Sequence, residues 1–288
     1  MEINGHTRLC GLIGNPVEHT LSPAIHNTLA EKMGHNLVYV PFYVEQGQLD
    51  VAVEGAFGLN VLGMNVTVPY KSDVIKSLAE IDELAQKIGA VNTLVRTDVG
   101  YKGYNTDILG LYRAMCGEGI KLEGEQAVLL GAGGAARAVA FLCAEKGVDK
   151  VYLLNRSVEK AQAVAEEVNE AFGRECIYPM VTADYEKLPD QKLLAIQGTS
   201  VGLHPDTDKA VIEDMEFYKR IHTGYDLIYK PAETKFMKLV KETGGYAYNG
   251  LKMLLYQGII AYELWNDVKV SEMVADEIYE VLKSRVAV

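Results

Sequence analysis

The sequence predicts an α/β protein of two domains, each a doubly wound layer of strands and helices. Two observations support this prediction. Apolar strand patterns alternate with helical patterns along the whole chain, without repeats or low-complexity segments, and this alternation is typical of βαβ units. The 288 residues also exceed the ~150 residues that one ordinary domain needs.

The N-terminal elements follow from local signals. Residues 8–13 are a short apolar strand. Residues 22–34 form a helix in which Ser22 is the expected N-cap, Pro23 takes the first helical position and Gly34 ends the helix. We expect the following elements to be strand 37–44, helix 46–58, strand 61–68, helix 71–79, a hairpin of 90–95 with 101–105 across the turn TDVG, and helix 106–116.

A second series of elements begins after the loop CGEGIKLEG, with the apolar strand 127–130. A glycine-rich turn, a helix that ends near Gly147 and strand 151–154 follow. The helical stretch 250–284 comes after this series, so we expect it to pack back on the first domain. The predicted domains are therefore residues 1–107 completed by residues 251–288, and residues 108–250.

Composition excludes several classes of function. The formal net charge of −11 argues against a nucleic-acid surface. No apolar run approaches the ~18 residues of a membrane span, and the N-terminus lacks the pattern of a signal peptide. The cysteines are scattered without zinc-type spacing, so we expect reduced thiols, no metal site and a cytoplasmic location; they are Cys10, Cys116, Cys143 and Cys176.

A glycine-rich motif lies between strand 127–130 and the helix after it. It fits the pattern G-x-G-x-x-A through Gly131, Gly133 and Ala136. The first glycine permits a tight turn, the second lets the backbone approach a pyrophosphate, and the small third residue brings helix and strand together. The helix N-terminus offers N–H groups to the anion. We therefore expect a Rossmann-type dinucleotide-binding domain, although a flexible turn is the alternative for such a string alone.

The end of strand 151–154 indicates which dinucleotide binds. NAD sites usually have Asp or Glu there, whose carboxylate accepts a hydrogen bond from the ribose 2′-hydroxyl. This chain instead has Asn155, Arg156 and Ser157, with Lys160 one turn later. A guanidinium can hold a 2′-phosphate through two parallel hydrogen bonds. The pattern therefore favours NADP as the cofactor. The alternative is a helix cap at Ser157 beside a surface charge.

A lysine follows the interrupted strand in the stretch GMNVTVPYK. Pro69 ends the strand, so Lys71 falls just beyond its carboxyl end, the edge at which open α/β sheets bind ligands. Reduction of a ketone by a hydride leaves an alkoxide that needs a proton donor. Asp107, in YNTDILG, is an available carboxylate partner. On the residues alone, a solvated surface lysine is favoured over an acid–base group.

An ordered set of motifs resembles the shikimate dehydrogenase family from Gly11 to Trp265. The motifs are GLIGNPVEHTLSPAIHN, GMNVTVPYK, GAVNT, GYNTD, GAGGAARA, NRS, YDLIYKPAET and NGLKMLLYQGIIAYELW. Members of that family reduce 3-dehydroshikimate to shikimate with NADPH, a step in chorismate and aromatic amino-acid biosynthesis. The resemblance implies an N-terminal α/β substrate domain, a Rossmann-type NADP-binding domain and a C-terminal helical return.

The resemblance also implies roles for individual residues. Lys71 would be the acid–base residue, hydrogen-bonded with Asp107 near the reacting oxygen. The hydroxyls of Thr20 and Ser22 would hold the substrate carboxylate. Other substrate contacts would come from Thr67, Asn92, Tyr229 and Gln257, with Asn92 and Asp107 on ring hydroxyls. Cofactor contacts would come from Gly131, Ala132, Gly133, Gly134, Ala135, Asn155, Arg156, Ser157, Lys160, and from Leu227 and Gly250 near the nicotinamide.

The chain departs from the family pattern at five positions. Gln197 and Gly198 stand where the family usually reads NATS, and Ile108 replaces the glycine of NTDGxG. Lys230 stands where asparagine is common, and Lys252 replaces a glycine of NGLGML. These departures leave open the shape of the loop around the nicotinamide, the hinge between the domains and the acid that is preferred.

Three functions are compatible with the sequence. The first is an NADP-dependent shikimate dehydrogenase acting on a small molecule, as a monomer or a homodimer. The second is a related oxidoreductase that acts on quinate or a similar cyclohexane acid, with NAD. Arg156 and Thr20 argue against it, because the quinate-active enzymes that the chain resembles tend to differ at those positions. The third is a catalytically inert metabolite sensor on the same scaffold. Retention of both Lys71 and Asp107 argues against a sensor, because a sensor needs no proton relay.

Overall fold

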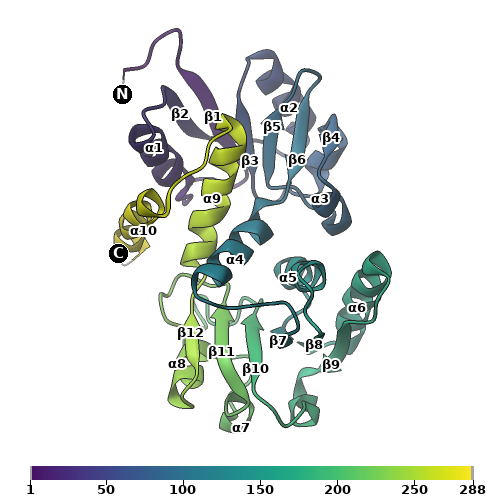
Figure 1. Cartoon of the computed structure of the whole chain (residues 1–288). Coiled ribbons are helices and arrows are strands. Elements are labelled where there is room, and N and C mark those ends of the chain that lie inside the picture. The colour runs from purple at the N-terminus through teal and green to yellow at the C-terminus, as the bar shows by residue number, and fades with distance from the viewer. Residues whose placement is uncertain (1, 287–288) are drawn as a thin grey trace. The chain divides into compact units, whose positions relative to one another are not determined.

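The computed structural model describes residues 2–286, and these residues form two compact units (Figure 1). We call the residues up to Arg113 together with Lys252–Arg285 unit 1, and Ala114–Leu251 unit 2. The division falls inside helix α4 (Thr106–Gly117), whereas the sequence pattern predicts it directly after Asp107. The assignment of unit 1 to the substrate and unit 2 to the cofactor stays a prediction.

Unit 1 is built on a mixed six-stranded sheet with the order β2-β1-β3-β5-β6-β4. Strands β1, β2 and β3 run parallel, while β5 is antiparallel to both β3 and β6. The pairing of β5 with β6 confirms the predicted hairpin. The strand bounds are β1 Arg8–Gly14, β2 Leu37–Tyr43, β3 Gly63–Val66, β4 Glu80–Ile81, β5 Thr93–Arg96 and β6 Tyr101–Tyr104.

The helices of unit 1 include two from the end of the chain. In α9, Trp265 donates from Nε1 to the Leu94 carbonyl oxygen at 2.9 Å, and a Cβ on Gly63 would collide with the same indole. Glycine in β3 therefore lets α9 lie against the sheet.

No helix within residues 2–286 is long and apolar enough to span a membrane. The bounds are α1 Ser22–Lys32, α2 Leu49–Gly58, α3 Glu83–Ile88, α9 Leu251–Asn266, α10 Glu272–Val286 and the 3₁₀ helix η1 Asp73–Ser77.

Two local predictions for unit 1 were wrong. Ser22 does not cap α1, because Leu21 is the N-cap residue and makes no side-chain capping hydrogen bond. The helix expected at 71–79 is only the 3₁₀ helix η1, since Leu78 has extended backbone that leads into β4. Within the stretch 250–284, Asp267 has a φ of 51° and separates α9 from α10.

Unit 2 has a six-stranded sheet in which all neighbours are parallel, with the order β12-β11-β10-β7-β8-β9. Counted within the unit, this is the order 3-2-1-4-5-6 of dinucleotide-binding folds. It confirms the predicted α/β class. The bounds are β7 Gln126–Leu130, α5 Gly134–Glu145, β8 Lys150–Asn155, α6 Val158–Phe172, β9 Ile177–Val181, η2 Thr182–Lys187, β10 Leu193–Gln197, α7 Met215–Tyr218, β11 Ile221–Asp226, α8 Lys235–Glu242 and β12 Tyr246–Tyr248.

The core of unit 1 contains a buried histidine among aromatic rings. The ring of His26, on α1, stacks on Tyr39 with centroids 4.2 Å apart and lies 4.9 Å from the ring of Trp265. Burial disfavours the imidazolium and lowers the pKa of His26 to about 3, against a smaller opposing effect of Asn65. The folded protein therefore keeps this ring neutral under conditions in which an unfolded chain protonates it.

We predict that His26 makes the stability of unit 1 depend on pH. Between pH 6 and pH 4 the unfolded chain binds a proton that folded His26 does not, so stability falls as the pH falls. One such proton contributes a slope of about 1.4 kcal/mol per pH unit. His26→Phe should flatten the slope by that amount, as measured by urea unfolding followed through the fluorescence of Trp265, the single tryptophan. The exposed variant His6→Phe is the control. An equal change of the pH slope in His6→Phe, or an unchanged slope in His26→Phe, would contradict this prediction.

Candidate active site

The turn that carries Lys71 is anchored on both sides of the lysine. The buried Tyr70 hydroxyl donates to the Val44 carbonyl oxygen at 2.7 Å, and the Lys71 carbonyl oxygen accepts from the Val91 N–H at 2.7 Å. The Lys71 side chain is 36% exposed. Its backbone is thus fixed at the carboxyl side of β3 while its ammonium group remains accessible.

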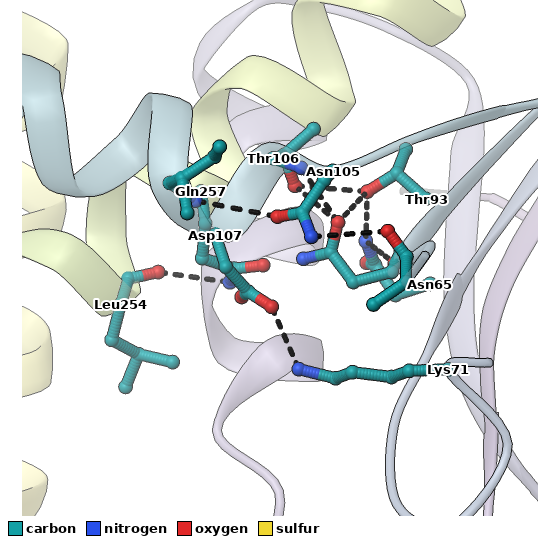
Figure 2. Close-up of polar contacts among 11 residues, drawn as sticks. Asn65, Lys71, Thr93, Asn105, Thr106, Asp107, Leu254 and Gln257 are labelled. Atoms are coloured by element: carbon teal, nitrogen blue, oxygen red, sulfur yellow. Dashed lines mark hydrogen bonds and ion pairs between the residues drawn. The ribbon is translucent and has the colours of Figure 1, made fainter. Parts of the chain in front are cut away.

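The ammonium group of Lys71 lies 2.7 Å from the Asp107 carboxylate (Figure 2). Asp107 stands in the first turn of α4, where the partial positive charge of the helix N-terminus favours a carboxylate. The Thr106 N–H donates to Asn92 Oδ1 at 2.6 Å and so fixes the start of that helix. A partly exposed ion pair contributes only about 0–1 kcal/mol to stability. The pair is therefore better explained by chemistry than by folding.

Behind the ion pair lies a buried polar network that sequence reasoning missed (Figure 2). Tyr39 Oη donates to Asn65 Oδ1 at 2.8 Å, and Asn65 Nδ2 donates to Thr93 Oγ1 at 3.0 Å. Thr93 and Thr106 share a hydroxyl hydrogen bond of 2.9 Å. The network joins β2, β3 and β5 to the first residue of α4. The available signal was Asn65, a polar residue inside the buried strand β3.

The predicted carboxylate clamp is formed by neighbouring hydroxyls. Thr20 Oγ1 donates to Ser22 Oγ at 3.1 Å and accepts from the Ser22 N–H at 3.2 Å. Ser22 is buried and Thr20 half-buried. Thr67 follows β3 directly, and a Cβ on Gly14 would collide with its methyl group. Glycine at the end of β1 therefore makes room for Thr67 at the same edge of the sheet.

Asn92 and Gln257 also lie in unit 1, and both are buried. The Asn92 carboxamide oxygen already accepts from Thr106, so any contact with a ligand falls to its NH₂ group. A Cβ on Gly110 would collide with the backbone of Gln257, so glycine lets α4 and α9 meet there. Figure 2 shows the Gln257 side chain beside Asp107.

The last predicted substrate contact is Tyr229. It and three positions that depart from the family pattern differ in how deeply they are buried. Tyr229 is half-buried in the loop after β11 and belongs to unit 2, whereas the other residues predicted to contact the substrate belong to unit 1. Ile108 is buried in α4, where its side chain joins the core. Lys230 is exposed, and Lys252 Nζ lies 5.7 Å from the centre of the Tyr279 ring.

In unit 2 the glycine motif forms the turn between β7 and α5. Gly131 has a φ of +104°, in which a side chain would be strained. Gly133 is the N-cap residue of α5, and no side chain bonds the first N–H groups of the helix. A Cβ would meet nothing within 4 Å at Gly133 or Gly134. With Ala132 and Ala135, the motif leaves an open helix N-terminus of the kind that accepts a pyrophosphate.

The residues predicted to read the 2′-phosphate follow β8. Asn155 Nδ2 donates to the Ser157 carbonyl oxygen at 2.9 Å. Arg156 and Lys160 are exposed, and within residues 2–286 neither forms an ion pair. The Ser157 hydroxyl donates to Glu159 Oε2 at 2.7 Å, and this bond lowers the pKa of Glu159. Sequence reasoning missed Glu159, although it stands two residues after Ser157.

Leu227 and Gly250, predicted to lie near the nicotinamide, are in contact. The Leu227 N–H donates to the Gln197 carbonyl oxygen at 3.1 Å, and a Cβ on Gly250 would collide with the Leu227 carbonyl oxygen. Both lie on the β11 side of the crossover between β7 and β10, where the strand order reverses. Open parallel sheets bind their ligands at such a crossover.

The strand order, the open glycine turn and the ammonium–carboxylate pair are together typical of a dinucleotide-dependent α/β oxidoreductase. The family model "Shikimate dehydrogenase substrate binding domain" matches residues 12–94, and "Shikimate / quinate 5-dehydrogenase" matches residues 115–178. A curated shikimate dehydrogenase (NADP(+)) from Caldanaerobacter subterraneus is 42% identical over 92% of this chain and 94% of its own length. The chain belongs to the shikimate dehydrogenase family.

Solved structures agree with this assignment. Shikimate 5-dehydrogenase from Listeria monocytogenes, in complex with shikimate and NAD, is 32% identical with a TM-score of 0.91 and covers 98% of each chain. The enzyme from Thermus thermophilus, in complex with NADP(H) and shikimate, is also 32% identical, with a TM-score of 0.82 over 96% of this chain and 100% of that one.

We predict that Ser22→Ala weakens substrate binding without unfolding the protein. A hydrogen bond to a charged group contributes about 1.5–3 kcal/mol, so the KM for shikimate should rise about ten-fold or more. Because the Ser22 side chain caps no N–H of α1, the melting temperature should change little. The control Ser72→Ala changes an exposed serine that also caps nothing. An unchanged KM in Ser22→Ala would remove Ser22 from the clamp.

Proposed function

We propose that the protein catalyses the reversible, NADP-dependent reduction of 3-dehydroshikimate to shikimate in chorismate and aromatic amino-acid biosynthesis, with Lys71 as the acid–base residue and Asp107 as its partner. The 2.7 Å contact between the Lys71 ammonium and the Asp107 carboxylate is the main support. The family to which the chain belongs and the NADP(+) enzymes among its relatives support the substrate and the cofactor.

The proton relay follows from the positions of the two side chains. Bound NADPH supplies the hydride that the carbonyl carbon of the ring accepts. Lys71, as the ammonium, gives a proton to the carbonyl oxygen, which becomes the hydroxyl of shikimate. In the reverse direction neutral Lys71 removes that hydroxyl proton. Asp107 orients the ammonium group and accepts a hydrogen bond from a ring hydroxyl. Proton transfer of this kind contributes about 10²–10⁴-fold to a rate.

Recognition of the substrate rests on short neutral side chains. The Thr20 and Ser22 hydroxyls, 3.1 Å apart, hold the carboxylate as a pair. Thr67, the Asn92 NH₂ group and Gln257 contact the ring hydroxyls, and Tyr229 is a further substrate contact. Neutral donors suit a small ring that carries one charge and several hydroxyls, because each hydroxyl needs a directional partner rather than a counter-ion.

The residues of unit 2 fit NADP. The open N-terminus of α5, with residues 131–135, receives the pyrophosphate. Arg156 and Lys160 provide positive charge for the 2′-phosphate in a chain of net charge −11. Asn155 holds the turn that carries Arg156, and Lys160 lies in the first turn of α6. Ser157 can donate to the phosphate only by leaving Glu159. Leu227 and Gly250 stand on the nicotinamide side.

We also propose that the enzyme acts in the cytoplasm, as a monomer or a homodimer. The four cysteines Cys10, Cys116, Cys143 and Cys176 are free thiols, of which only Cys116 is exposed. Free thiols are typical of a reducing compartment.

A steady-state assay of shikimate and quinate, each with NADP and with NAD, tests the function directly. We expect shikimate with NADP to give the highest kcat/KM. A higher value for quinate with NAD would indicate the related quinate enzyme. The absence of turnover with all four pairs, in a protein that binds NADP, would indicate a metabolite sensor.

The variant Arg156→Asp tests the cofactor assignment. The carboxylate should repel the 2′-phosphate and accept from the 2′-hydroxyl of NAD. Loss of a charge-assisted hydrogen bond alone should lower kcat/KM for NADP about ten- to hundred-fold, so the preference should shift toward NAD. Lys121→Asp, at an exposed lysine of the same unit, changes the net charge equally and serves as the control. An unchanged NADP/NAD ratio in Arg156→Asp would contradict the assignment.

A further inference from the structure

A buried glutamine organises the loop that leaves β10. Gln197 is the last residue of that strand and is 1% exposed. Its Oε1 accepts from the Thr199 N–H at 2.6 Å, and its Nε2 donates to the Val201 carbonyl oxygen at 2.9 Å. One side chain thus satisfies backbone groups at both ends of residues 199–201. Without it, this half-buried donor and acceptor would lose their protein partners, and residues 199–201 would lose the contacts that hold their conformation.

A buried carboxylate organises the neighbouring loop in the same way. Asp226 ends β11 and stands opposite Gln197 in the parallel register. Its Oδ1 accepts from the Ile228 N–H at 2.9 Å, and its Oδ2 accepts from the Thr234 hydroxyl at 2.6 Å. Gln197 Nε2 approaches the same carboxylate at 3.5 Å. Asp226 therefore ties the segment after β11 to Thr234, the N-cap residue of α8.

These two loops lie where unit 2 should hold the reactive end of a dinucleotide. The β10 loop borders the glycine turn, because a Cβ on Gly131 would lie 2.6 Å from the Thr199 methyl group. The β11 loop begins with Leu227, whose N–H is held by the Gln197 carbonyl oxygen. Gly250 lies against Leu227. Two side chains in contact, Gln197 and Asp226, thus fix both loops beside the crossover.

We propose that Gln197 is a positioning residue for the nicotinamide half of the dinucleotide, held in place by Asp226. This inference rests on one part of the proposed function, the binding of NADP. Gln197 touches no part of the reaction itself. It keeps residues 199–201 and Leu227 in one conformation before the cofactor binds, so that binding does not have to order them. Residues 155–160 follow β8, which is separated from β10 by β7. None of the hydrogen bonds of Gln197 or Asp226 described above involves them.

The test compares two ligands in the full-length protein. NADP has a nicotinamide half, whereas 2′,5′-ADP carries only the adenosine and its phosphates. Gln197→Met keeps a similar length and volume but removes both hydrogen-bonding groups. We expect it to weaken NADP binding, measured by calorimetry, about ten-fold or more, with a fall in kcat for shikimate. Binding of 2′,5′-ADP should stay within about two-fold of the wild type. Gln197→Asn, which keeps a carboxamide, should restore part of the loss.

A general structural role for Gln197 predicts a different result. Equal weakening of NADP and 2′,5′-ADP, or unchanged NADP binding and kcat, would overturn the proposal. Thr199→Val gives a second route if Gln197→Met does not fold, because it removes only the Oγ1 that accepts from the Val201 N–H at 3.1 Å. It should show the same selective loss. Since both ligands are measured by binding, a wild type that binds NADP but does not oxidise shikimate would refute the proposed function and leave this inference standing.

Discussion

The proposed chemistry of unit 1 depends on the ion pair between Lys71 and Asp107. Each partner is fixed through its own backbone: the lysine turn by the Tyr70 hydroxyl and the Val91 N–H, and the aspartate helix by Asn92. An exposed pair held this firmly contributes little to stability. The precise position of the Lys71 ammonium matters for the proposed reaction, because a proton donor must lie within hydrogen-bond distance of the oxygen that receives the proton.

Buried amide and hydroxyl groups hold the start of α4 in place against three strands of the sheet. Asn65 connects Tyr39 on β2 with Thr93 on β5, and Thr93 meets Thr106 at the start of α4. In unit 2, the buried side chains of Gln197 and Asp226 likewise form hydrogen bonds with the loops that follow β10 and β11. In both units a polar side chain at or near the end of a buried strand satisfies groups of another segment, because an unpaired polar group there is costly.

Local signals in the sequence predicted most of the fold, whereas the pairing of Lys71 with Asp107 was implied by the family resemblance. Periodicity located β1, β2, β3, β7 and β8, the turn TDVG predicted the β5–β6 hairpin, and Gly131 predicted the dinucleotide turn. Strands β4 and β9 to β12 were not predicted individually. Features that depend on tertiary register escaped prediction. Nothing local distinguishes Ser22 as a cap from Ser22 as the first helical residue. The contacts Asn65–Thr93 and Gln197–Asp226 join residues 28 and 29 positions apart, and they exist only because particular strands are neighbours.

The most direct test of the acid–base role is a double-mutant cycle on kcat with Lys71→Met, Asp107→Asn and the double variant. If the two residues act as one proton relay, Lys71→Met should lower kcat about 10²–10⁴-fold. Asp107→Asn should then add little in the Lys71→Met background, because residues that act as a unit are not additive. A folded Lys71→Met protein with near-normal kcat, or fully additive losses, would contradict the account.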